Sequence, residues 1–69
     1  MKNIAIIGIG LIGSSIARHI RANNKEVIIN IVDNSKLELE KSKKLNLGNN
    51  YFENISSCKD ENEIIFICT

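Results

Sequence analysis

The chain has 69 residues, and its nine lysines and arginines against eight aspartates and glutamates leave a formal net charge of +1. This length allows at most one small domain, and the mixed charges, without a basic stripe among aromatic residues, argue against a nucleic-acid-binding surface. Cys58 and Cys68 have neither the spacing of a metal site nor that of a CxxC redox motif, so we expect no metal and no disulfide.

The first predicted elements are a strand over residues 2–7 and a helix over residues 11–23. The strand is continuously apolar, as in a central parallel strand covered on both faces. In the helix, Ile12, Ile16 and Ile20 recur every four residues and are expected to face the sheet. The glycine turn between the two has the spacing G-x-G-x-x-G. A strand, this turn and a helix in that order indicate a dinucleotide-binding βαβ unit.

Each glycine of the turn has a physical role. Gly8 allows the tight turn out of the strand, Gly10 allows a pyrophosphate to approach the backbone, and Gly13 allows the helix to pack closely. The amides of Leu11, Ile12 and Gly13 begin the helix without internal acceptors, and the helix dipole adds positive charge there. The turn is therefore a predicted pyrophosphate site.

The apolar run over residues 4–13 also resembles the core of a signal peptide, but that interpretation leaves both the glycine spacing and Asp33 to chance. The run is also shorter than the roughly 20 residues that span a bilayer. We expect a cytoplasmic protein without a membrane segment.

The second strand, over residues 27–32, ends at Asp33, twenty residues after Gly13. A carboxylate there can accept hydrogen bonds from the adenosine ribose and repels a 2′-phosphate, which favours NAD over NADP. Asn30 interrupts the strand and needs a hydrogen-bond partner if that face is covered.

A second helix is predicted from Ser35 to about Leu45, with Gly48 as a late stop. Ser35 and Glu38 form a capping box. The expected apolar face is thin and consists mainly of Leu37, Ser42 and Leu45. Lys41, Lys43 and Lys44 are expected on the solvated face, and phosphate binding by Lys36 or Lys41 is the alternative.

The remaining elements are a short edge strand over residues 49–52, a turn near residues 57–60 and a fourth apolar strand over residues 64–68. Right-handed crossovers place the strands in the order 3-2-1-4. The predicted fold is α/β, a partial Rossmann fold with a parallel sheet and flanking helices. Its crevice lies where Gly8 and Thr69 meet. We expect residues 1–69 to be the N-terminal half of a dinucleotide-binding domain in a longer protein.

The segment IAIIGIGLIGSSIA over residues 4–17 closely resembles the opening of prephenate/arogenate dehydrogenases, and VDNS at 32–35, LNLG at 45–48 and the terminal ICT are also similar to that family. The resemblance implies NAD(P)-dependent oxidative decarboxylation of prephenate or arogenate in tyrosine biosynthesis. By this match, the pyrophosphate would contact Gly8, Gly10, Leu11, Ile12 and Gly13. Asp33, Asn34 and Ser35 would face the adenosine ribose, and Thr69 would lie near the nicotinamide.

In that family the catalytic histidine, the substrate-binding residues and a helical dimerisation domain come later in the chain. The resemblance therefore implies no catalytic residue here, an inactive fragment when alone, and a homodimer at full length. His19 does not match the catalytic context and is expected at the surface. Asn34, where many relatives have arginine, also favours NAD.

Two alternatives remain open. Nucleotide-sensing modules of potassium channels and transporters share the glycine turn and the acidic residue, but have a GDA turn after the third strand, where this chain has Phe52, Glu53 and Asn54. Another β-hydroxyacid dehydrogenase is the second alternative.

Overall fold

The computed structural model describes residues 2–58, 62 and 64–68. The elements follow the order β1 (Asn3–Ile7), α1 (Leu11–Asn23), β2 (Ile28–Val32), α2 (Lys36–Lys44), β3 (Asn50–Phe52), the 3-10 helix η1 (Ile55–Ser57) and β4 (Ile64–Ile67). All strand pairs are parallel, and the sheet order is β3-β2-β1-β4. The predicted α/β fold and strand order are confirmed.

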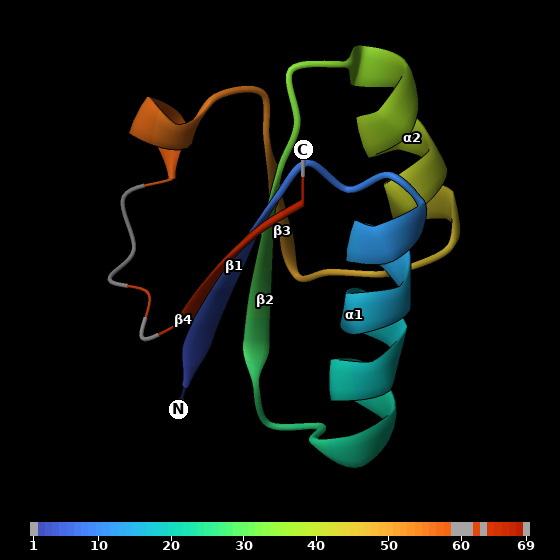
Figure 1. Ribbon diagram of the computed structural model, residues 1–69, viewed down its shortest axis with the longest axis vertical. Coiled ribbons are helices and arrows are strands. Elements are labelled where there is room, and N and C mark those ends of the chain that lie inside the picture. The colour runs from blue at the N-terminus through green and yellow to red at the C-terminus, as the bar shows by residue number, and fades with distance from the viewer. Residues whose placement is uncertain (1, 59–61, 63, 69) are drawn as a thin grey trace.

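Both α-helices cover the same face of the sheet, and η1 lies on the other side (Figure 1). This arrangement follows from the connections, because two successive right-handed crossovers in one direction place their helices on one face. The chain then returns past β2 and β1 to add β4 at the opposite edge. The carboxyl ends of β1 and β2 therefore lie beside each other.

The core lies between the sheet and the two helices. On α1, Gly13 and Ala17 are buried, and Ile16 and Ile20 pack against the core from the sides. The prediction for Ile12 was wrong, since this side chain is 68% exposed. Neighbouring residues of a helix point about 100° apart. Because Gly13 and Ala17 face the sheet, Ile12 points away from it.

On α2, the buried residues are Leu39 and Ser42, whereas Leu37 and Leu45 are exposed. The prediction that Leu37 and Leu45 form the buried face of this helix was therefore wrong, whereas the burial of Ser42 is confirmed. The helix is mostly polar, so the pattern of apolar residues in its sequence does not determine which side of the helix faces the sheet. The buried pair stands three residues apart on one side, and the hydroxyl of Ser42 is satisfied by donating to the carbonyl of Glu38 at 2.8 Å.

Helix α2 ends at Lys44, and Asn46 adopts a left-handed conformation with φ 54°. Asn46 therefore takes the role that was predicted for Gly48. At Gly48, a Cβ would lie 2.7 Å from Cδ1 of Ile31 and 3.1 Å from the carbonyl of Ile29. Gly48 serves instead to let the chain pass closely over β2.

Asn30 is completely buried, and it alternates with Ile29 and Ile31, so it faces away from the helices. Its Nδ2 donates to Oδ1 of Asn62 at 3.0 Å, and its Oδ1 accepts from Nδ2 of Asn50 at 2.8 Å. These bonds supply the partner that the sequence required. They also attach the β3–β4 connection, which carries η1, to the sheet.

Within the described residues, no helix has both the length and the apolar character needed to cross a bilayer. The predicted turn near residues 57–60 is observed in part as η1. Residues 59–61 lie outside the described part of the chain.

Candidate nucleotide-binding site

The glycine turn joins β1 to α1 at the carboxyl edge of the sheet. Gly8 has φ 85°, a conformation that residues with a Cβ rarely adopt. Its N–H donates to the carbonyl of Val32 at 2.8 Å, which ties the turn to the end of β2. At Gly13, a Cβ would lie 2.6 Å from the carbonyl oxygen of Gly8, so this glycine allows the helix to touch the turn.

Gly10 differs from the other two glycines because the space beside it is open. A Cβ at Gly10 would have no heavy atom of the described chain within 4 Å. Gly10 is also the N-cap residue of α1, and no side chain of the described residues caps this helix. A group approaching from outside would therefore meet backbone rather than a side chain.

The first turn of α1 exposes hydrogen-bond donors. The N–H groups of Leu11, Ile12 and Gly13 have no acceptor within the helix, and the side chains of Leu11 and Ile12 are 90% and 68% exposed. The helix dipole places about half a positive charge at this end. An uncapped helix start behind an open glycine fits a diphosphate.

Asp33 stands between the two loops of the site. Its Oδ2 accepts the main-chain N–H of Ile9 at 3.0 Å, and its Oδ1 accepts that of Ser35 at 2.9 Å. The N–H of Asp33 itself donates to the carbonyl of Phe52 at 3.0 Å. Because each carboxylate oxygen can accept more than one hydrogen bond, the half-buried side chain keeps capacity for ribose hydroxyls.

Ser35 caps α2 by accepting the N–H of Glu38 at 3.3 Å, as predicted. The reciprocal bond of the predicted capping box is replaced, because the N–H of Ser35 donates to Asp33. The carboxylate of Glu38 lies 3.8 Å from Nζ of Lys41. The cap therefore belongs to the same hydrogen-bonded unit as the carboxylate of Asp33.

A hollow of about 310 Å³ opens beside Asp33. Its wall is formed by the ends of β1 and β2 and by the segment after β3, and consists of Ile7, Gly8, Val32, Asp33, Asn34, Glu53, Asn54 and Ile55. An apolar wall next to a carboxylate suits an adenosine, whose base is flat and whose ribose offers hydroxyl donors. We refer to this hollow as the adenosine cleft.

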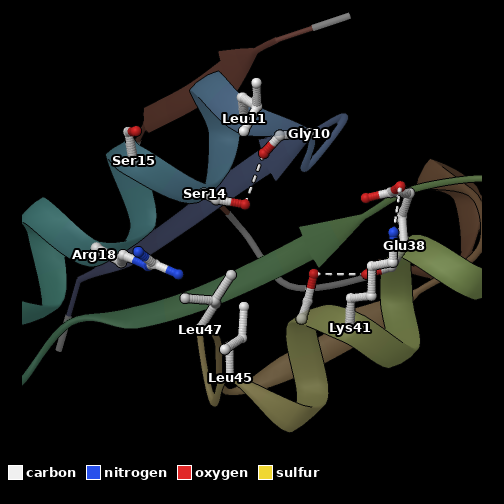
Figure 2. Close-up of a pocket in the computed structure, with 10 residues that line it drawn as sticks. Gly10, Leu11, Ser14, Ser15, Arg18, Glu38, Lys41, Leu45 and Leu47 are labelled. Carbon is white, nitrogen blue, oxygen red and sulfur yellow. Dashed lines mark hydrogen bonds and ion pairs between the residues drawn. The ribbon is translucent and has the colours of Figure 1, made fainter.

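A larger hollow of about 540 Å³ lies between α1 and α2 and adjoins the glycine turn at Gly10. Arg18 reaches into it from α1 and Lys41 from α2, and the hydroxyl of Ser14 donates to the carbonyl of Gly10 at 2.6 Å (Figure 2). It does not include Asp33. A nucleoside whose ribose contacts Asp33 would therefore lie in the smaller hollow.

The structure brings most of the predicted site residues to one edge of the sheet. Gly8, Gly10, Asp33, Asn34 and Ser35 surround the turn and the cleft, and Leu11, Ile12 and Gly13 form the helix start. Thr69 lies outside the described residues. His19 is exposed on α1, as expected. Among the described residues, no cluster of three or more histidine, cysteine or acidic side chains could hold a metal.

The sequence interpretation missed the third wall of the cleft, formed by Glu53, Asn54 and Ile55. A signal for it existed, because the carboxyl ends of parallel strands meet at one edge of the sheet. Residues directly after the third strand therefore had to approach those after the second.

Two comparisons bear on the identity of this site. The family model described as NADP oxidoreductase, coenzyme F420-dependent, matches residues 3–69. The chain is 39% identical over 67 residues to a cyclohexadienyl dehydrogenase of Zymomonas mobilis subsp. mobilis, an alignment that covers 97% of this chain and 23% of the relative. The chain thus spans about 23% of that relative's length. These matches confirm the resemblance to the prephenate/arogenate dehydrogenase family and a nicotinamide cofactor, NAD or NADP.

Proposed function

The chain belongs to the family described as NADP oxidoreductase, coenzyme F420-dependent, and from this premise we propose that it is the cofactor-binding part of an NAD-dependent dehydrogenase acting on prephenate or arogenate. The observation that carries the proposal is the placement of Asp33. Its carboxylate is bonded to the glycine turn and to the α2 cap, and it borders the adenosine cleft.

The residues of this chain bind and orient the cofactor. The N–H groups of Leu11, Ile12 and Gly13 would hold the pyrophosphate, and Asp33, with Asn34 and Ser35, would hold the adenosine ribose. Thr69, the second residue after β4 in the sequence, is proposed for the nicotinamide side. The bound cofactor supplies hydride acceptance, while the protein supplies position.

The substrate class is supported by the resemblance of residues 4–17 and by the name of the Zymomonas relative. We propose oxidative decarboxylation of prephenate or arogenate in tyrosine biosynthesis, in the cytoplasm. Residues 1–69 would form the first half of a dinucleotide-binding domain. We propose that the full-length protein also contains the second half of this domain and a separate domain for substrate binding and dimerisation. We further propose that the full-length protein is a homodimer.

The test is turnover by the intact protein that carries this chain. We expect NADH formation that depends on prephenate or arogenate, together with NAD binding measured by isothermal titration calorimetry. Binding of NAD without turnover of either substrate would contradict the proposed reaction and favour a nucleotide-sensing module. Failure to bind NAD or NADP at all would contradict the cofactor site itself.

A further inference from the structure

We propose that Glu53 is a specificity-determining residue of the adenosine cleft, which disfavours a phosphate on the ribose by its own charge and by neutralising Lys36. This inference rests on the proposed function, because it concerns the choice between NAD and NADP at the same site. It addresses a tension in the observations, since the family description names NADP whereas the cleft is bordered by two carboxylates.

The first step concerns the place of Glu53. It directly follows β3, and the main-chain bond from Asp33 to Phe52 at 3.0 Å holds the ends of β2 and β3 together. Glu53 therefore lines the adenosine cleft together with Asp33 and Asn34. A 2′-phosphate on a ribose held by Asp33 would enter the field of both carboxylates.

The second step concerns Lys36, the first residue of α2. Its position next to the Ser35 cap places it at a helix start, where the helix dipole already favours an anion. A lysine there would be a suitable partner for a 2′-phosphate. In this structure, however, its Nζ lies 3.9 Å from Oε1 of Glu53.

The third step concerns the neighbouring charges. Lys36 and Glu53 share a small surface hollow with Glu40 and Lys43. Lys43 is directed over the ring of Tyr51, with Nζ 5.7 Å from the ring centroid. Glu40 adds a further negative charge, so this wall has no net positive charge to offer a phosphate.

The expected effect of Glu53 on cofactor selectivity is limited by the solvent exposure of its ion pair with Lys36. The Lys36 and Glu53 side chains are 80% and 56% exposed, so water and salt weaken their interaction. Removal of the Glu53 charge should therefore shift the ratio of NADP to NAD affinity by about two- to fivefold at low ionic strength, and by less at high ionic strength.

The experiment measures dissociation constants for NAD and NADP on the intact protein at low and high salt. The variants are Glu53→Gln, Lys36→Ala, the double variant, and Glu26→Gln as a control. Glu26→Gln makes the same change in net charge just before the amino end of β2, whereas the cleft lies at the carboxyl end of this strand. We expect Glu53→Gln to improve NADP binding relative to NAD binding. The added Lys36→Ala should reduce that gain to the part that comes from the charge of Glu53 itself, and the control should leave the ratio unchanged.

The outcomes separate this inference from the proposed function. If the unsubstituted protein binds NAD but Glu53→Gln and Glu26→Gln give the same NADP to NAD ratio, the role of Glu53 is refuted and the cofactor site stands. If the unsubstituted protein binds neither nucleotide, the proposed function fails and this inference fails with it. A gain from Glu53→Gln that is equally large with and without Lys36 would overturn the neutralisation step.

Discussion

The carboxylate of Asp33 accepts the main-chain N–H of Ile9 across 3.0 Å, and this bond joins residues 24 positions apart in the sequence. It connects the end of β2 to the middle of the glycine turn. A second bond from the N–H of Ser35 connects the same carboxylate to the start of α2. The group expected to bind ribose therefore also fixes the loop expected to bind pyrophosphate.

Replacement of Asp33 should consequently change both binding and stability. We expect Asp33→Ala to weaken NAD, to narrow its advantage over NADP, and to cost about 1.5–3 kcal/mol of unfolding free energy, the range for hydrogen bonds to a charged group. Calorimetric titration with both nucleotides and urea unfolding measure the two effects. Asp33→Asn is the matched variant, because it retains the size and one acceptor while it removes the charge. Unchanged cofactor selectivity in both variants would exclude the ribose contact.

The glycines of the turn should respond differently to substitution. At Gly10 the space for a Cβ is open, so Gly10→Val should abolish nucleotide binding while it preserves most of the fold. At Gly13 a Cβ would lie 2.6 Å from the carbonyl of Gly8, so Gly13→Ala should lower the unfolding free energy by about 1–3 kcal/mol through overpacking. Thermal unfolding followed by circular dichroism and nucleotide titration, applied to both variants, distinguish the role of Gly10 in binding from the role of Gly13 in packing. Retained affinity in Gly10→Val would remove Gly10 from the site.

Gly48 offers a test of packing at a distance from the cleft. Gly48→Ala would press a methyl group against Ile31 and the backbone of Ile29, at 2.7 Å and 3.1 Å. We expect a loss of about 1–3 kcal/mol of unfolding free energy with an unchanged ratio of NAD to NADP affinity. Asn46→Gly, at the residue that actually ends α2, should be neutral or slightly stabilising because glycine accepts φ 54° without strain. Equal destabilisation by both changes would contradict the assigned roles.

The buried amide of Asn30 should matter for the wall of the cleft. Asn30→Leu removes the bonds to Asn50 and Asn62 and sets their amides against an apolar side chain. We expect a cost of about 1–3 kcal/mol and faster amide hydrogen exchange in η1. Asn50→Ala, which breaks only one of the two bonds from an exposed position, should cost less. Exchange in η1 that is as slow in Asn30→Leu as in the unsubstituted chain would show that the amide does not hold this connection.

Local patterns in the sequence were sufficient for the elements and their order. The apolar run before Gly8, the glycine spacing and the position of Asp33 each reflect a requirement of backbone geometry or charge that acts within a few residues. Parallel pairing and right-handed crossovers then left the order 3-2-1-4 as the expected arrangement, which the structure has.

The sequence by itself thus determined where the strands, the helices and the glycine turn lie, because these depend on neighbours along the chain. Only the tertiary structure decided that Leu39 rather than Leu37 meets the sheet, that Asn30 is satisfied by Asn50 and Asn62, and that Glu53 borders the cleft with Asp33. The physical reason is that each of these outcomes is a contact between segments distant in sequence. The rotation of a helix or the partner of an amide is set by the surface it meets rather than by its own pattern.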